Sequence, residues 1–275
     1  MSFNSYVDPH GWPADEPPWD RAIRLHRLNV QMASARLGDV VVSHQSAALL
    51  HGLPVWGTDL AKAHFTRVAS GRARVGRAVQ VHRGTTAVDE VVEVSGLRIT
   101  SVERAIVETA CTTSYEVGVV LSDAALRMRL TSRESLAAVV RRHQRWHGSP
   151  AARAAVHFAN GLSDSVGESR FRVLMANHGL PEPELQVEIR DDDGQPIGRV
   201  DFLLVGVLVI EFDGALKYRD GVEAVVAEKW REDRLRERGY GVLRFGWADL
   251  NDPHKTAARI WQALARHAPR SRDKQ

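Results

Sequence analysis

Two apolar runs near residue 206 alternate in the way expected of paired β-strands. Residues 199–204 and 207–213 are rich in Val, Leu, Ile and Phe, and Gly206 lies between them. Apolar runs joined by a short segment with glycine are typical of a hairpin in a packed sheet. A three-residue loop centred on Gly206 would pair Leu204 with Leu208 and would fix the register of the whole hairpin.

Three carboxylates interrupt this apolar pattern, at Asp201, Glu211 and Asp213. Side chains alternate between the faces of a strand, so Glu211 and Asp213 share a face, and the register above places Asp201 opposite Glu211. Like charges that oppose each other destabilise a sheet, so a cation is expected beside them. Mg²⁺ binds two or three carboxylates while it keeps several waters. The alternative partners are nearby arginines, such as Arg199, Arg231 and Arg244.

The segments around the hairpin predict the element order α, β, β, β, α, β, α for the C-terminal half. Ser165 and Glu168 form a capping-box pattern before a helix that Gly179 ends, and Glu168 is expected to bond back to the amide of the cap residue. The remaining elements are expected as a strand at 185–190, a turn at 191–194, a helix at 222–238, a strand at 240–245 and a helix at 253–268.

This order, together with four short motifs, resembles the PD-(D/E)XK nuclease superfamily, and more closely its Vsr-like (very-short-patch-repair-like) branch. The motifs are VDF at 200–202, IEFDG at 210–214, KY at 217–218 and GYGVLRF at 239–245, within a resemblance that covers about residues 163–268. The resemblance implies a restriction-endonuclease-like mixed sheet flanked by helices, and cleavage of DNA with Mg²⁺ or Mn²⁺. It also implies that Asp201 and Glu211 are metal ligands and that Glu168 assists them.

The superfamily pattern has a lysine two residues after the glutamate, and Asp213 occupies that position here. The resemblance therefore leaves the water-activating cation to another residue. Lys217 follows the second strand closely. Lys229 shares a helical stripe with three valines, which predicts that it projects towards the sheet, although a surface lysine at the helix edge is the alternative. The chain has only five lysines against 32 arginines, and these two lie beside the acids in the sequence.

The N-terminal half predicts a smaller α+β region followed by helices. Residues 1–20 lack periodicity and are expected to form a mobile arm. Strands are expected at 40–42, 62–68, 78–83, 91–94 and 97–99, and helices at 24–37, 43–52, 101–111, 115–129, 132–145 and 149–160. The caps of the last four helices are expected at Thr100 or Ser101, Ser114, Thr131 or Ser132, and Ser149.

The net charge of +3 is unevenly distributed along the 275 residues. The arm carries four acids and no bases, residues 21–160 carry 19 bases and 10 acids, and residues 161–275 carry 18 bases and 20 acids. We therefore expect an arm and two domains with these boundaries. A basic domain next to one with an acid cluster is compatible with DNA binding, and a basic hairpin loop makes Arg72, Arg74 and Arg77 candidate phosphate contacts.

Two segments of the basic domain, VSHQSAALLHGLP at 42–54 and LRITSVER at 97–104, resemble the region after the winged helix in AbiEi-type antitoxins of type IV toxin–antitoxin systems. The resemblance implies a DNA-binding or regulatory role, and a cognate toxin or another partner protein. The chain before Ser43 is too short for a complete winged helix. The resemblance therefore leaves out the element with which those antitoxins read DNA.

Other residue classes narrow the function. His44, His51, His64 and His82 lack the spacing of zinc motifs, and we expect separate cap or strand-surface side chains. The single cysteine, Cys111, excludes an intrachain disulfide and is expected to be a small core residue. We expect neither a signal peptide nor a membrane span, because no apolar run has the required length. These features favour a cytoplasmic protein.

The preferred hypothesis is a metal-dependent DNA endonuclease or nickase of the α/β (α+β) class. Asp201 and Glu211 would hold Mg²⁺ or Mn²⁺, which lowers the pKa of a bound water. The remaining candidates for further acids or for the water-orienting cation are Asp213, Glu168, Lys217 and Lys229. The alternative is a non-catalytic, antitoxin-like DNA-binding or regulatory protein with a degenerate nuclease fold.

Overall fold

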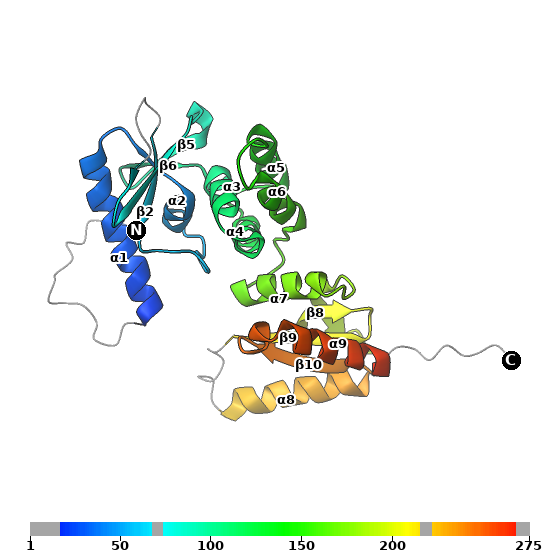
Figure 1. The fold of residues 1–275 in the computed structure, drawn as a ribbon. Helices are drawn as coiled ribbons and strands as arrows, with labels where there is room; N and C mark the ends of the chain where they lie inside the picture. Colours follow the sequence, from blue (N-terminus) through cyan, green and yellow to red (C-terminus); the bar gives the residue numbers. More distant parts are fainter. Residues whose placement is uncertain (1–16, 68–73, 215–221, 268–275) are drawn as a thin grey trace. The chain divides into compact units, whose positions relative to one another are not determined.

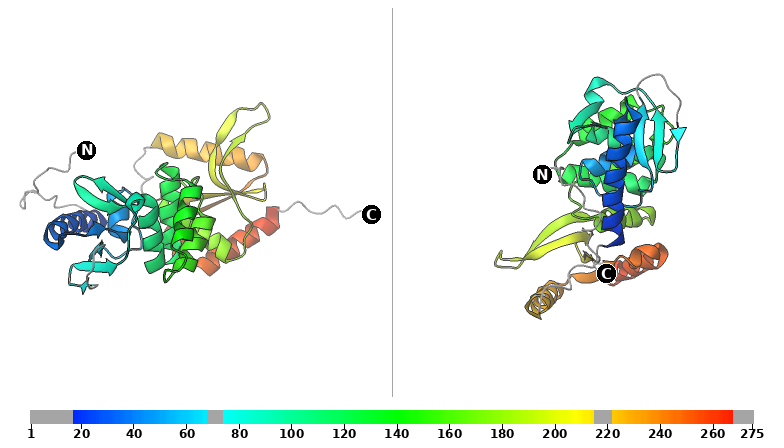
Figure 2. Two further views of the ribbon diagram at one scale, coloured as in Figure 1. Left: turned by 90° about the horizontal axis from the view of Figure 1, so that it is seen from above. Right: turned by 90° about the vertical axis from the view of Figure 1, so that its left-hand side faces the viewer.

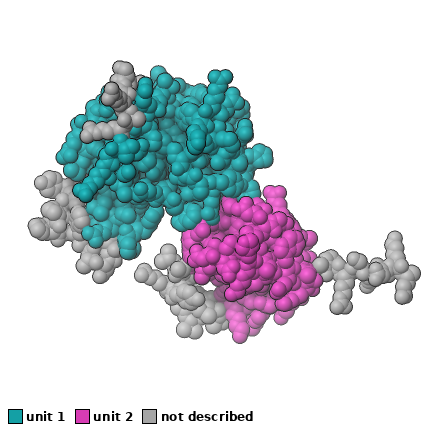
Figure 3. Space-filling model, in the orientation of Figure 1, with its two compact units in different colours: residues 1–161 teal, residues 162–275 magenta. Residues whose placement is uncertain are grey.

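The structure is a computed structural model that describes residues 17–67, 74–214 and 222–267. The chain forms two compact units, residues 1–161 and residues 162–275 (Figure 3), and their boundary lies one residue after the predicted one. The mixed α/β class is confirmed, because each unit combines helices with a sheet. None of the helices within the described ranges combines the length and the apolar character that crossing a membrane requires.

The described part of the N-terminal unit contains a sheet with the strand order β3-β4-β2-β1-β6-β5. Its strands are β1 (Val41–Val42), β2 (Ala63–Arg67), β3 (Arg74–Val75), β4 (Val79–Arg83), β5 (Val91–Val94) and β6 (Leu97–Thr100). Its helices are α1 (Pro18–Leu37), α2 (His44–Leu50), α3 (Val102–Thr112), α4 (Tyr115–Arg127), α5 (Arg133–Arg142) and α6 (Ser149–Phe158), with a 3-10 turn, η1 (Val88–Glu90). Helices α3 to α6 lie together beside the sheet (Figure 1).

Three of the last four helices of this unit begin at predicted caps. Each cap side chain accepts a hydrogen bond from the backbone N–H three residues further on, at Ser101, Ser114 and Ser132. The cap predicted at Ser149 is wrong, because Gly148 precedes α6 in a left-handed conformation with φ 81°. Ser149 is the first residue of the helix, and its hydroxyl donates to the carbonyl oxygen of Gln144.

Helix α1 begins at Pro18, so the predicted arm is wrong for residues 18–20. Proline is favoured in the first turn of a helix, where its missing N–H removes no hydrogen bond. Residues 1–16 of the predicted arm lie outside the described ranges. Further along, α1 buries Val30 and donates or accepts a hydrogen bond through His26 Nε2 to Ser46 Oγ of α2 (2.8 Å), which ties the two helices together.

The C-terminal unit has the predicted order of elements. They are α7 (Val166–Asn177), β7 (Glu184–Arg190), β8 (Pro196–Leu204), β9 (Leu208–Asp213), α8 (Val222–Glu237), β10 (Gly241–Gly246), a 3-10 turn η3 (Asp249–Asn251) and α9 (Pro253–His267). The strand order is β10-β9-β8-β7. Strand β10 is parallel to β9 and the other pairs are antiparallel, so the sheet is mixed.

Helices α7 and α9 cover one face of this sheet, and α8 covers the other (Figures 1 and 2). On the first face, the Phe171 ring of α7 lies 5.0 to 5.9 Å from the rings of three strand residues: Phe202, Phe212 and Phe245. On the second face, Leu235 of α8 packs with Leu203 and Val209. Each strand therefore contributes side chains to two apolar cores, as in an α/β/α sandwich.

The first turn of α7 packs unusually close to β9 because Gly167 has no side chain. A Cβ at Gly167 would lie 2.0 Å from Cε1 of Phe212, far inside van der Waals contact. The next residue, Glu168, is buried. The glycine therefore allows the helix to bring this carboxylate up to the hairpin.

Candidate functional site

The hairpin of β8 and β9 has the register predicted from the sequence. Leu204 pairs with Leu208, as a three-residue loop centred on Gly206 requires. Regular pairing continues for two more positions. The regular pairs end there, so Asp201 and Glu211 do not form a further pair of the ladder, but the Asp201 charge contributes to the raised pKa of Glu211 and the two acids are therefore near each other.

The two strands separate where the acids meet. The last regular pair joins Phe202 to Ile210, and the Asp201 side chain then takes the place of a backbone acceptor. Its Oδ2 accepts a hydrogen bond from the N–H of Phe212 (2.8 Å), which satisfies that donor where the ladder ends. Glu211 is 3% exposed, and Asp201 is half-buried. The acids therefore line an opening in the sheet rather than a solvated surface.

Glu168 reaches the same region from α7. Its carboxylate accepts hydrogen bonds from Ser165 Oγ (2.8 Å) and from the N–H of Asp164 (2.8 Å), while Ser165 Oγ accepts one from Glu168 N (3.1 Å). The predicted capping arrangement is present, with one correction: the carboxylate binds the amide of Asp164 and not that of the cap residue. Helix capping is not the only interaction of Glu168, because the charge of Asp201 also acts on its carboxylate.

Gln186 of β7 is a member of this cluster that the sequence did not indicate. Its Nε2 donates to Glu168 Oε2 (2.9 Å), and it lies between the pairs that join β7 to β8 on either side of Asp201. Its φ of 52° is uncommon for a glutamine within a strand. No sequence pattern marks such a conformation, because apolar periodicity carries no information on a single left-handed residue.

Burial and mutual repulsion perturb these carboxylates. Burial raises the pKa of Glu168; the amide of Asp164 opposes this shift, and the Asp201 charge adds to it. Burial also raises the pKa of Glu211 to about 7; Arg231 opposes the shift, and Asp201 adds to it. Acids with raised pKa values that share one region are more common at functional sites than elsewhere. A cation bound here would relieve the repulsion.

The cation that the structure places at Glu211 is Arg231 of α8. Its Nη2 lies 2.8 Å from Glu211 Oε1 and 2.8 Å from Glu228 Oε1, and its Nη1 donates to the carbonyl oxygen of Arg199 (3.2 Å). The side chain crosses the sheet over Gly198, where a Cβ would lie 2.9 Å from Arg231 Cδ. The alternative of an arginine partner, weighed from the sequence, is therefore confirmed for Arg231.

The other two arginines have different partners. Arg199 pairs with Asp164 (2.8 Å). Arg244 binds Glu228 and Glu232, and its Nη1 lies 3.7 Å from Asp213 Oδ2. Asp213, at the end of β9, is half-exposed. The charged group close to it is the guanidinium of Arg244. Within the described ranges, no third acid joins Asp201 and Glu211 closely enough for all three to share one ion.

The two candidate lysines do not meet the acids in the described part of the chain. Lys217 lies outside the described residues. Lys229 is exposed on α8, so the prediction that its side chain projects towards the sheet is wrong. In the described part of α8, Glu228, Arg231 and Leu235 face the sheet instead.

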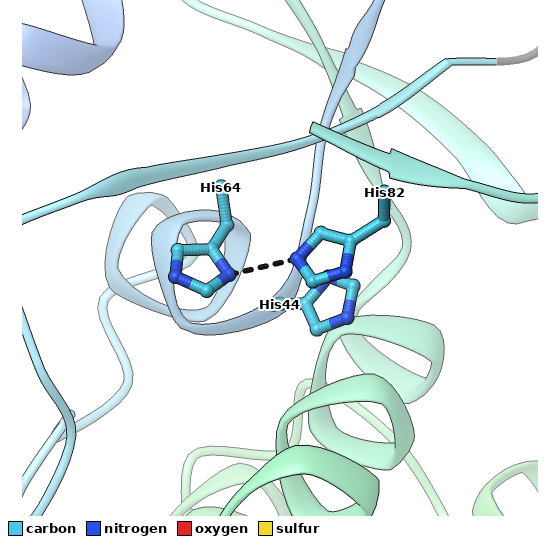
Figure 4. A group of neighbouring side chains, drawn as sticks. All are labelled: His44, His64 and His82. Carbon is cyan, nitrogen blue, oxygen red and sulfur yellow. Dashed lines mark hydrogen bonds between the residues drawn. The ribbon is translucent and has the colours of Figure 1, made fainter. Parts of the chain in front are cut away.

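A second cluster, the histidine cluster, consists of His44, His64 and His82 in the N-terminal unit (Figure 4). One ring nitrogen from each lies within 4.8 Å of those of the other two. His64 Nδ1 and His82 Nε2 are 3.0 Å apart, and the rings of His44 and His82 stack with centroids 3.8 Å apart. The expectation of separate histidines is wrong for these three, and it holds for His51, which binds the carbonyl oxygen of Thr100.

The three histidines come from elements that are distant in sequence but adjacent in the fold. His44 is the first residue of α2, and His64 and His82 lie on the neighbouring parallel strands β2 and β4. Burial lowers the pKa of each ring, and the charges of the other histidines lower that of His44 further and that of His64 to about 4. The rings are therefore neutral at pH 7, and each has one ring nitrogen that carries no proton.

The candidate DNA-contacting arginines are only partly described. Arg72 lies outside the described residues, and so does the side chain of Arg74. Arg77 is exposed and lines a groove of about 330 Å³ between α1 and the β3–β4 turn, which also contains Arg36 and Asn29. Two arginines and no acidic residue are among the described residues that line this groove.

Two mycobacterial proteins are similar to this chain through both units. Over 263 residues the chain is 31% identical to the uncharacterized protein Rv2248 of Mycobacterium tuberculosis (strain ATCC 25618 / H37Rv) and equally to the uncharacterized protein MT2308 of strain CDC 1551 / Oshkosh. These alignments cover 95% of this chain and 91% of each relative. No protein-family model matches the chain, and no solved structure matches it significantly.

Proposed function

The chain belongs to the family of the Mycobacterium tuberculosis proteins Rv2248 and MT2308, and for it we propose a cytoplasmic, metal-dependent DNA endonuclease or nickase activity in the C-terminal unit. The observation that carries this proposal is the opening of the β8–β9 ladder at Asp201 and Glu211, with Glu168 beside them and the pKa of Glu211 raised to about 7. The likeness of this layout to the PD-(D/E)XK nucleases supports the same activity.

The donor groups at this opening suit a hard divalent cation. Asp201 and Glu211 offer only carboxylate oxygens, which Mg²⁺ and Mn²⁺ prefer. Arg231 contacts Glu211 through Oε1, and Phe212 contacts Asp201 through Oδ2, so each acid engages one oxygen in these bonds. Mg²⁺ or Mn²⁺, when bound, would lower the pKa of a water and stabilise charge on the scissile phosphate.

The residues of the chain have separate roles in this proposal. Asp201 and Glu211 hold the cation, and the hydrogen bond from Phe212 orients the Asp201 carboxylate. Burial raises the pKa of Glu168, which makes this carboxylate a stronger proton acceptor than an exposed one, and Gln186 fixes its position through the bond to Oε2. Arg231 lies beside Glu211, where its guanidinium can also neutralise charge on a phosphate.

The alternative is an antitoxin-like DNA-binding or regulatory protein in which the nuclease fold is a scaffold. The Arg231–Glu211 ion pair favours it, because a guanidinium already neutralises one of the two metal ligands. In that case the groove with Arg36 and Arg77 would bind nucleic acid without cleavage, and a cognate toxin or another protein would be the partner.

The test is the nicking of supercoiled plasmid by the full chain with Mg²⁺ or Mn²⁺. We expect the wild type to nick the plasmid. In Asp201→Asn and Glu211→Gln the nicking rate should fall by more than the roughly 10–100-fold that the loss of a second-shell partner causes at a metal site. Asp193→Asn removes one charge from an exposed turn of the same unit and serves as the matched control. Binding of DNA without nicking would favour the alternative, and equal nicking by all variants would indicate a contaminant.

A further inference from the structure

We propose that His44, His64 and His82 bind one divalent transition-metal ion of the zinc class, with a coordination position open to the cavity beside them. This site is separate from the carboxylate opening, because it lies in the other unit and offers imidazole nitrogens in place of oxygens. Imidazole suits Zn²⁺, Co²⁺ and Ni²⁺ and is not a ligand that Mg²⁺ selects.

The spacing of the nitrogens fits such an ion. Zinc binds imidazole nitrogen at about 2.0–2.1 Å, so two ligands of a tetrahedral site are about 3.3 Å apart. His64 Nδ1 and His82 Nε2 are 3.0 Å apart, and all three ligand atoms lie within 4.8 Å of one another. Figure 4 shows these two nitrogens directed at each other and the His44 ring stacked against His82. A rotation of the His44 ring out of the stack would complete the set.

Gln45 provides independent support, because one of its buried atoms lacks a partner. Gln45 is 4% exposed; its Nε2 lies 3.0 Å from His64 Nε2, while its Oε1 is buried without a hydrogen bond among the described residues. A metal on His64 Nδ1 requires the ring proton on Nε2, and that proton needs an acceptor. Exchanging the amide oxygen and nitrogen of Gln45 supplies that acceptor, at the cost of the hydrogen bond that Nε2 donates to the carbonyl oxygen of Asp59 (3.2 Å), and second-shell partners of ligating histidines have this role.

His44 is held in a similar way. Its Nδ1 lies 2.9 Å from Ser43 Oγ and 3.8 Å from Glu108 Oε2, and its backbone N–H donates to the same Glu108 oxygen (3.2 Å). A carboxylate next to the far side of a ligating imidazole is common around zinc. The φ of His44, 54°, is also uncommon for a residue that begins a helix. Such a conformation is retained only where surrounding contacts impose it.

The cavity next to the cluster leaves room for a further ligand. It has a volume of about 280 Å³, and His44, His82 and Glu108 line it together with Thr66, whose buried Oγ1 has no hydrogen-bond partner in the described ranges. Three histidines with a fourth position open are the pattern of catalytic zinc, whereas structural zinc is enclosed by four protein ligands. The ligand class is therefore water or a small oxygen ligand that enters from this cavity.

The test is calorimetric titration of the chelator-treated full chain with Zn²⁺, together with the visible absorption of Co²⁺. We expect one ion per chain and the spectrum of a four-coordinate site. His64→Gln and His82→Gln should each weaken binding by more than roughly 100-fold, beyond the effect of losing a second-shell group. Gln45→Leu should weaken it by roughly 10–100-fold.

Two matched controls locate the site. His157→Gln changes an exposed histidine of the same unit, and Asp201→Asn changes the carboxylate opening; both should leave Zn²⁺ affinity unchanged. Circular dichroism establishes that each variant is folded, and Zn²⁺-induced shifts of the imidazole nitrogens in NMR spectra of the wild type give a readout that needs no variant. Absence of Zn²⁺ binding by the wild type, or binding retained by both His64→Gln and His82→Gln, would overturn the proposal.

Discussion

Replacement of Glu211 by glutamine should make the C-terminal unit more stable at neutral pH, although it removes one half of an ion pair. The Glu211 carboxylate is 3% exposed and close to Asp201, so its charged form is disfavoured even with Arg231 at 2.8 Å. Glutamine has the shape of the protonated acid and keeps an oxygen that accepts from Arg231. The variant therefore avoids the cost of ionisation and keeps most of the contacts.

The magnitude follows from the pKa of Glu211, which burial raises from 4.5 to about 7. A folded-state pKa above the unfolded value means that the unfolded state loses its proton first. Stability is then highest below about pH 4.5, falls as pH rises to about 7, and is constant above that. A pKa difference of this size corresponds to on the order of 3 kcal/mol of unfolding free energy. On going from about pH 4 to about pH 8, the free energy of unfolding of Glu211→Gln should therefore gain up to that amount over the free energy of unfolding of the wild type.

The measurement is urea unfolding at about pH 5 and about pH 8, with hydrogen exchange of peptides from β8 and β9 as the probe, because it reports on one unit of a two-unit chain. Glu188→Gln on exposed β7, where Glu188 pairs with Arg190, is the matched control and should show no such pH-dependent gain. A variant less stable than the wild type at about pH 8 would refute the reasoning, since it would mean that Arg231 outweighs burial and repulsion. Added Mg²⁺ should stabilise only the wild type.

Two further predictions concern the packing and the basic groove. Gly167→Ala should destabilise the chain by about 1–3 kcal/mol in urea unfolding, because the new Cβ would overlap Phe212, whereas Gly214→Ala, in open space, should not. If the N-terminal unit binds DNA, the double variant Arg36→Ala with Arg77→Ala should lower the slope of log affinity against log salt by about 2, because each lost phosphate contact lowers it by about one unit. Fluorescence anisotropy measures this slope. An unchanged slope would exclude this groove as the DNA-binding surface.

The local structure of the chain could be predicted from its sequence because local rules determine it. The hairpin register follows from apolar alternation on both sides of Gly206, and the helix starts at Ser101, Ser114 and Ser165 follow from side chains that accept backbone N–H groups. Ser149 failed as a cap because Gly148 occurs immediately before it and adopts the left-handed conformation more easily.

The residues that make up the two candidate sites could be predicted less completely than the local structure. The acids of the hairpin were found because they interrupt an apolar pattern. Gln186 and the histidine cluster interrupt nothing, and only the tertiary fold brings their side chains together with their partners. Arg231 could be named from the sequence only as one of three possible arginine partners, and Lys229 was expected to face the sheet in error, because a mixed helix has several faces of similar polarity.

The two sites differ in how the fold treats charge, and this difference bears on metal selection. At Asp201 and Glu211 the fold gathers like charges and raises the pKa of Glu211, so a hard cation there would relieve a repulsion that exists without it. At the histidine cluster, burial lowers the pKa of the rings and keeps them neutral. A bound metal ion would therefore relieve no repulsion there, and its affinity would depend on the type of donor atom and on geometry alone. Mg²⁺ should therefore act on the stability of β8 and β9 without displacing Co²⁺ from the histidines, because imidazole nitrogens bind Co²⁺ and are not ligands that Mg²⁺ selects.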